Sequence, residues 1–166
     1  MLTDHAKLMR FFSDAEEVSG RKKLQKMIYI LQKWNFPFEE KYQFHFYGPY
    51  SEELSLRVEE LCNLGFLAEE KENKSNYVQY HYHITGSGRD FLQQFGMTMP
   101  DMTEPIALLQ EKSSRFLELV ATMLYFDGLS RDDVNEKVHT VKPKQQYTDL
   151  ELDEAHRLIQ AMHPVQ

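Results

Sequence analysis

Residues 51–95 read SEELSLRVEELCNLGFLAEEKENKSNYVQYHYHITGSGRDFLQQF, and this stretch decides the fold. Ser51 is well placed to cap a helix whose apolar stripe recurs at helical spacing: Leu54, Val58 and Leu61. Gly65 then ends this helix, because glycine readily adopts the left-handed conformation found after a helix C-terminus. Residues 77–84 alternate apolar and polar side chains as a strand does, after a polar turn at 72–76.

The hairpin leads into Thr85-Gly86-Ser87-Gly88, which starts a further helix. The order is therefore helix, Leu-Gly-Phe-Leu, hairpin, Ile-Thr-x-x-Gly and helix. This is the sequence outline of a winged helix, in which the hairpin is the wing. Neither the apolar face of the helix nor that of the hairpin can be buried alone, so each covers the other. The sequence predicts a winged-helix unit over roughly residues 50–95.

Patterns on both sides extend this unit. Upstream, they predict four elements: helices over about 3–15 and 21–34, a strand at 42–46 and a turn at 47–50. Downstream, they predict a linker and three helices: 97–104, then 105–126, 130–139 and 149–162. The predicted fold class is α+β and mostly α. It has a winged-helix-like domain at 1–96 with a β-hairpin wing, followed by a C-terminal helical part at 105–166 that packs on it.

Composition restricts the class of protein. The 166 residues include a single cysteine, Cys62, which suits a reducing compartment, and 42% apolar residues, which suffice for a folded core. The N-terminus lacks the pattern of a signal peptide. The most apolar stretch, 117–126, is too short to span a bilayer. We therefore predict a cytoplasmic protein that does not enter a membrane.

The charges argue against a nucleic-acid surface. The formal net charge is −7, of which residues 1–95 contribute −2 and residues 96–166 contribute −5. The helix that begins at Ser51 is the one that reads the major groove in a winged helix. Here it carries four carboxylates against a single base, Arg57, and carboxylates repel phosphates. In addition, some fifteen residues separate this helix from the preceding one, whereas a helix-turn-helix uses a short turn.

The first candidate site is an aromatic turn together with the start of the helix after it. Its members are Tyr47, Gly48, Pro49, Tyr50, Glu52 and Glu53. Tyrosine is enriched in the centres of protein–protein interfaces, so an exposed turn of this kind indicates a contact with another protein. If the rings are instead buried, they seal the hairpin against the core.

The second candidate site is the one dense basic cluster, at the start of the second predicted helix. Its members are Arg21, Lys22, Lys23 and Lys26. Such a cluster could contact DNA phosphates or an acidic partner. A plain solvated helix start is the alternative interpretation.

The sequence predicts no metal, no cofactor and no catalytic residue. Two acid–histidine pairs have the i, i+3 spacing of di-metal helical bundles: Glu136 with His139, and Asp153 with His156. Such a site needs two further carboxylates, which the sequence does not identify. His81 and His83 share one strand face without a cysteine or carboxylate in register. No Ser/His/Asp set with a nucleophile elbow is recognisable either.

Two stretches resemble a known family. Residues 20–29 read GRKKLQKMIY and residues 42–51 read YQFHFYGPYS. With them, nearly the whole chain resembles the YwgA family of Firmicute proteins. The resemblance brings no catalytic activity with it.

The same stretches are similar, more distantly, to Panacea-domain proteins, the SocA-like antitoxin and adaptor group. Those proteins pair a Lys-Leu-x-Lys helix, here residues 23–26, with a Tyr-Gly-Pro turn, here residues 47–49. Their C-terminal Leu-x-x-x-x-His-x-x-x-Pro segment is similar to residues 134–143, with valine in place of the leucine and Lys144 in place of the aromatic that follows. The resemblance implies a regulatory role through a protein partner and assigns no role to His139.

Three functional hypotheses follow. The preferred one is a non-enzymatic regulator or adaptor that binds another protein through the winged-helix face and the aromatic turn. The alternative is a DNA-binding transcriptional regulator that uses the basic cluster and the wing. The third is a metal-dependent enzyme in the C-terminal helices. A homodimer through the helix predicted at 105–126 is compatible with each.

Overall fold

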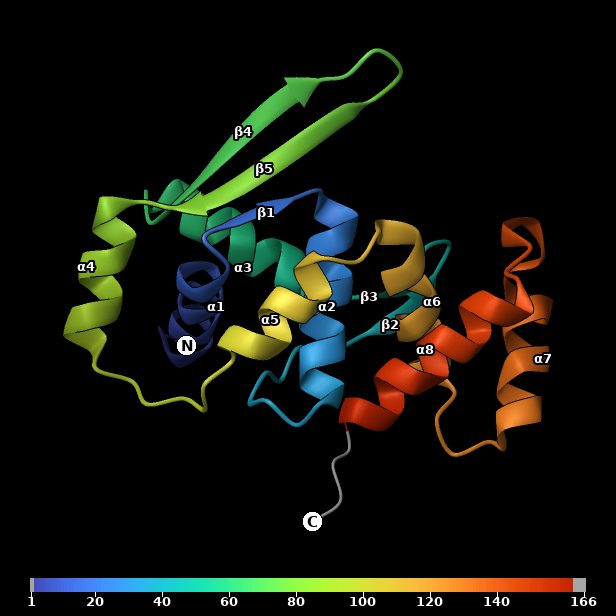
Figure 1. Ribbon diagram of the computed structural model, residues 1–166. Helices are drawn as coiled ribbons and strands as arrows, with labels where there is room; N and C mark the ends of the chain where they lie inside the picture. The colour runs from blue at the N-terminus through green and yellow to red at the C-terminus, as the bar shows by residue number, and fades with distance from the viewer. Residues whose placement is uncertain (1, 163–166) are drawn as a thin grey trace.

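Short helices and two small antiparallel sheets build the chain (Figure 1). The computed structural model describes residues 2–162. Within them the α-helices are α1 (Leu2–Ala15), α2 (Arg21–Lys33), α3 (Glu52–Asn63), α4 (Gly86–Phe95), α5 (Thr103–Gln110), α6 (Ser114–Tyr125), α7 (Arg131–Val141) and α8 (Asp149–Met162), with a short 3-10 helix η1 (Pro143–Gln145). The strands are β1 (Glu17–Ser19), β2 (Gln43–His45), β3 (Gly48–Tyr50), β4 (Leu67–Asn73) and β5 (Val78–Ile84). The fold class is α+β and mostly α, as predicted. In this part of the chain no helix has the length and apolar character that a bilayer span requires.

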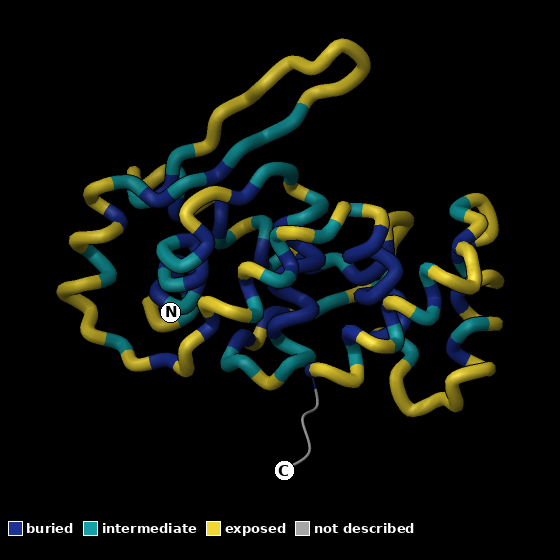
Figure 2. Tube along the Cα trace, in the orientation of Figure 1, coloured by how far each residue is buried: buried dark blue, intermediate teal, exposed yellow. Residues whose placement is uncertain are grey.

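The β4–β5 hairpin projects from the rest of the molecule (Figure 1). Residues 69–78, its outer half, are all exposed (Figure 2), whereas the side chains at its base are buried: Leu67, Tyr82 and Ile84. Through β5 the base also pairs with β1, which gives the strand order β1-β5-β4. The sequence predicts only a helix over about 3–15 and a second helix over 21–34, with no strand between them. Three residues are too few to show an alternating pattern, so β1 is missed.

Close packing explains the glycine of the Ile-Thr-x-x-Gly motif. The hydroxyl of Thr85 accepts a hydrogen bond of 3.0 Å from the backbone N–H of Gly88 and caps α4. A Cβ on Gly88 would lie 2.2 Å from the carbonyl oxygen of Phe66 and 2.6 Å from Cε of Met9. No side chain fits there, because the nearest atom belongs to the backbone.

The segment between α2 and α3 forms a second hairpin, in which Phe44 of β2 lies opposite Pro49 of β3. The prediction of a turn at 47–50 is therefore wrong: the bend is at residues 46–47, and the residues after it form a strand. Proline lacks an amide N–H and is typical of turns, but a two-stranded sheet offers it an edge position. This hairpin accounts for the long interval between the two helices.

One hydrophobic core runs through both halves of the chain. In α2 every residue from 24 to 31 is buried, and in α6 every residue from 116 to 124 is buried. These two helices pack against each other, and α6 also contacts α7 and α8. The segment at 97–104 is attached to the same core by Met99 and Met102, which are both buried.

The helix predicted at 105–126 is in fact two helices, α5 and α6. The helix is interrupted at residues 111–113. There the hydroxyl of Ser113 accepts a hydrogen bond from the backbone N–H of Phe116 and caps the N-terminus of α6. Apolar spacing continues across the break and hides it. Because residues 116–124 are buried within the chain, α6 does not offer the open face that the suggested homodimer contact requires.

We expect Gly88→Ala to lower the free energy of unfolding by about 1–3 kcal/mol, the usual cost of overpacking a core position. Gly86→Ala is the matched control, because a Cβ on Gly86 meets no atom within 4 Å in the same helix. Urea denaturation of both variants measures the difference. Equal losses in the two variants would contradict the packing described at Gly88.

Candidate functional site

The tip of the β2–β3 hairpin carries two exposed aromatic side chains. Phe46 is 94% exposed and Tyr47 is 61% exposed. The next two residues, Gly48 and Pro49, are buried, and Tyr50 is half-buried. The aromatic turn predicted from the sequence thus has an exposed tip and a buried base.

Gly48 allows the base to lie against α6. Its φ of +87° belongs to the left-handed region that favours glycine. A Cβ at this position would lie 3.2 Å from Oγ1 of Thr122 and 3.7 Å from Cγ of Glu118. Glycine is therefore required for its conformation and for the space it leaves.

Lys26 binds the base of the hairpin from inside the protein. Its side chain is 1% exposed, and its Nζ donates a hydrogen bond of 2.7 Å to the carbonyl oxygen of Pro49. Burial lowers the pKa of Lys26 to about 8, although the nearby carboxylate of Glu118 acts in the opposite direction. The last lysine of the Lys-Leu-x-Lys helix thus binds the proline of the Tyr-Gly-Pro turn, which gives the two motifs one structural purpose.

Glu118 on α6 is shared by two further lysines. It is 1% exposed, and its carboxylate oxygens lie 2.7 Å from Nζ of Lys22 and 3.4 Å from Nζ of Lys142. These contacts are ion pairs by distance, without the alignment of hydrogen bonds. A carboxylate buried this deeply is tolerated only when it is paired. We call Lys22, Lys26, Glu118 and Lys142 the buried ionic cluster.

The buried ionic cluster fixes the hairpin backbone on both sides of the tip. Lys142 donates a hydrogen bond to the carbonyl oxygen of Phe46, and Lys26 donates one to that of Pro49. The backbone is bound from inside while the side chains of the tip remain in solvent. The site is therefore a hairpin whose backbone is held from inside and whose two aromatic rings are exposed.

The basic cluster predicted from the sequence does not form a single basic face. Arg21 donates a hydrogen bond of 3.1 Å to the hydroxyl of Tyr82, and Lys23 donates one of 2.8 Å to the carbonyl oxygen of Gln110. The other two members belong to the buried ionic cluster. All four cations therefore make contacts within their own chain.

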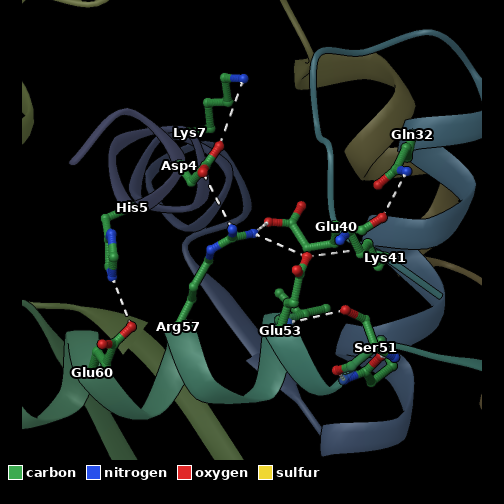
Figure 3. A network of polar contacts seen from close by, with 12 residues as sticks. Asp4, His5, Lys7, Gln32, Glu40, Lys41, Ser51, Glu53, Arg57 and Glu60 are labelled. Atoms are coloured by element: carbon green, nitrogen blue, oxygen red, sulfur yellow. Dashed lines mark hydrogen bonds and ion pairs between the residues drawn. The ribbon is translucent and has the colours of Figure 1, made fainter. Parts of the chain in front are cut away.

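The single base of α3 points inward (Figure 3). Arg57 lies 3.3 Å from the carboxylate of Asp4 and is hydrogen-bonded to Glu40. Burial raises the pKa of Glu40, and Arg57 opposes that shift. Glu53 lies 3.9 Å from the same guanidinium and accepts a hydrogen bond of 3.0 Å from the backbone N–H of Lys41. The network ties α1, the loop after α2 and α3 together.

The solvent side of α3 is left with carboxylates. Glu52 and Glu59 are exposed, and Glu60 pairs with His5 of α1 at 3.0 Å. Among the residues predicted to bind a protein, Tyr47 and Glu52 are exposed, whereas Phe46, the more exposed ring of the tip, is not one of the predicted residues. Glu53 and the Gly48-Pro49 base are engaged inside the molecule.

The acid–histidine pair of α8 is engaged by residues of α7, whereas the pair on α7 is exposed. Both residues of the α7 pair are exposed. On α8, Asp153 lies 2.6 Å from the guanidinium of Arg131, and the ring of His156 is hydrogen-bonded to Asn135 at 2.8 Å. Within residues 2–162, no group of three or more His, Cys, Asp or Glu side chains could hold a metal ion.

A polar row across the three-stranded sheet is not predicted from the sequence. Nδ1 of His81 lies 2.8 Å from the hydroxyl of Ser19 on β1, and its Nε2 pairs with Glu72 on β4. The row depends on the pairing of β1 with β5, which the sequence does not show. Ser19, His81 and Glu72 do not line the pocket described next. We infer that their contacts stabilise the pairing of the three strands.

A pocket of about 700 Å³ lies between the tip, α2, α3 and the base of the β4–β5 hairpin. Its volume suits a small molecule. The charged residues that line it include both cations and carboxylates: Arg21, Lys22, Glu59 and Glu69. The charge of the pocket therefore favours no class of ligand. Cys62 also lines it, but burial raises the pKa of this thiol to about 11, which keeps it protonated at neutral pH.

The fold and the site together define a small, mostly helical α+β protein with a projecting hairpin and a fixed aromatic tip. The chain is similar to the Bacillus subtilis (strain 168) protein named "Uncharacterized protein YwgA", with 58% identity over 165 residues that cover 99% of each chain. The chain belongs to the YwgA family, which confirms the membership predicted from residues 20–29 and 42–51. No family model matches the chain.

The buried amine of Lys26 predicts a pH dependence of stability. In the unfolded chain its pKa is near 10.5 and in the folded chain it is about 8. Between these values the unfolded chain holds the proton and the folded chain does not, so the free energy of unfolding rises with pH. From about pH 7 to about pH 9.5, we expect the wild type to gain roughly 2 kcal/mol relative to Lys26→Met.

Urea denaturation across this pH range measures the gain. Lys71→Met is the matched control, because Lys71 is exposed on the wing, and it should keep the wild-type profile. Parallel pH profiles for the wild type and Lys26→Met would show that the Lys26 amine does not titrate in this range.

Proposed function

We propose that the chain is a non-enzymatic regulatory or adaptor protein of the cytoplasm that binds another protein through the tip of its β2–β3 hairpin. The observation that carries this proposal is Phe46, which is 94% exposed above a backbone bound by buried lysines. Covering an exposed aromatic ring with a partner is favourable, because it removes apolar surface from water. A ring on a fixed backbone loses little conformational entropy on binding, and both properties are typical of an interface anchor.

The order and pairing of the elements support a winged-helix scaffold for this function. The chain runs α1, β1, α2, α3, β4, β5, and β1 pairs with β5 at the base of the projecting hairpin. The departure is the β2–β3 hairpin, which replaces the short turn between α2 and α3. On this scaffold the aromatic tip is an inserted feature.

Affinity capture from the native cytoplasm tests the proposal. We expect the wild type to retain a specific protein and Phe46→Ala to lose it by more than about tenfold, the effect of removing an interface hot spot. Leu150→Ala is the matched control, because Leu150 is an apolar residue that is 72% exposed on α8. It should retain the same protein as the wild type.

Two results would refute the adaptor proposal. One is capture of the same proteins by all three chains, and the other is that neither the wild type nor Leu150→Ala retains any protein beyond those retained by Phe46→Ala. The thermal unfolding of Phe46→Ala should match that of the wild type, since the ring is exposed. A lost partner then reports on binding rather than on folding.

A DNA-binding regulator is the second candidate, and the proposed winged-helix scaffold favours it. The contacts of its basic cluster count against it, as does the acidic face of α3. We expect no salt-sensitive shift of duplex DNA by the wild type. A shift that the double variant Arg21→Gln, Lys23→Gln abolishes would replace the adaptor proposal with the DNA-binding one, and this variant leaves the buried ionic cluster intact.

A further inference from the structure

We propose that the partner of the tip is an acidic protein segment. It lies with an apolar side chain against Phe46 and with its carboxylates toward the lysines around the hairpin. This inference rests on the proposed function and adds the chemistry of the partner.

The charges of the chain are strongly segregated. Residues 18–38, 41–51 and 137–148 are three of the stretches that contain no Asp or Glu. Together they hold nine of the 19 Lys and Arg residues and none of the 26 Asp and Glu residues. These three stretches are therefore basic in a chain whose net charge is −7.

These three stretches meet at the tip. Nζ of Lys22, from the first stretch, lies 4.6 Å from the centroid of the Tyr47 ring in the second. Lys142, from the third, donates a hydrogen bond to the carbonyl oxygen of Phe46. Two residues further on, Lys144 is exposed. The aromatic tip is thus flanked by cations from the start of α2 and from the end of α7.

A shallow cleft of about 500 Å³ runs beside the tip, between the hairpin and the end of α7. Its lining combines apolar surface with positive charge and contains no carboxylate: Phe44, His45, Phe46, Val141 and Lys142. Nζ of Lys142 lies 5.5 Å from the centroid of the Phe44 ring. An apolar side chain of the partner would contact these rings while a neighbouring carboxylate would face the exposed Lys144.

A short acidic segment fits this surface better than a long polyanion does. At physiological salt, exposed charges more than about 8 Å apart are largely screened from each other. A short segment therefore meets only the local cations. A nucleic-acid strand would extend past the tip toward the rest of the chain, which carries all 26 carboxylates. The surface accordingly favours a protein partner.

Selection of short peptides from a random displayed library, with the full chain as bait, tests the inference. We expect the enriched peptides to combine Asp or Glu with an apolar residue and to bind less tightly as salt is raised. Lys144→Glu should lower the affinity of the chain for synthetic versions of these peptides by about fivefold. Lys71→Glu makes the same charge change on the exposed wing and should leave their binding unchanged.

The outcomes separate this inference from the proposed function. Peptides that are lost in Phe46→Ala, yet show no acidic bias and are indifferent to Lys144→Glu, would overturn the acidic partner and support the tip as a binding site. Peptides that bind Phe46→Ala as well as the wild type would overturn the tip itself. If no peptide is enriched over the Phe46→Ala bait, the acidic-segment inference falls, while capture from the cytoplasm decides the proposed function independently.

Two further measurements address other occupants. A single-stranded oligonucleotide that binds the wild type more tightly than the best peptide would replace the protein partner with nucleic acid. Self-association in sedimentation experiments that Lys144→Glu abolishes would make a second copy of the chain the occupant. Either result would overturn the inference, whereas weak oligonucleotide binding and a monomer in solution would support it.

Discussion

A carboxylate in the centre of the core constrains the whole molecule. Glu118 lies on α6 among nine consecutive buried residues, where an unpaired charge would be strongly destabilising. Its partners are Lys22 from the first turn of α2 and Lys142 from the end of α7, so these helices have to meet in one arrangement. Lys26 adds the β2–β3 hairpin to the same arrangement through the carbonyl oxygen of Pro49. Four charged side chains thus determine how the two halves of the chain are joined.

The exposed tip is a consequence of these buried charges. Apolar contacts are not directional, so the packing of α6 on α2 by itself would tolerate some rotation of one helix on the other. Ion pairs at fixed positions do not tolerate it. The lysines also need hydrogen-bond acceptors once they are out of water, and the carbonyl oxygens of Phe46 and Pro49 provide them. Because the backbone of the hairpin is hydrogen-bonded to the buried lysines, the side chains of Phe46 and Tyr47 point into solvent.

Local features of this fold can be predicted from the sequence, and non-local ones cannot. The β4–β5 hairpin, α3 and α4 are recognisable because helix caps and the alternation of apolar and polar residues act over a few neighbouring residues. The strand β1 escapes prediction because it exists only by pairing with β5. The aromatic composition of residues 47–50 marks the candidate site, but which rings are exposed depends on α6. The burial of Lys26 is the hardest feature to predict, because a basic run is typical of a solvated helix start and Glu118 is distant in sequence.

The charges that remain outside the core divide the surface into two regions. Arg57, the one base of α3, turns inward to Asp4 and Glu40 and leaves that helix acidic toward solvent. The basic stretches 18–38, 41–51 and 137–148 meet instead around the tip. On the proposed winged-helix scaffold, α3 is the helix that would contact DNA, and its exposed carboxylates repel an anion. The surface that attracts an anion lies instead around the β2–β3 hairpin. The buried ionic cluster binds the backbone of this hairpin and leaves Phe46 94% exposed at its end, which is the arrangement that supports the proposed binding of a partner there.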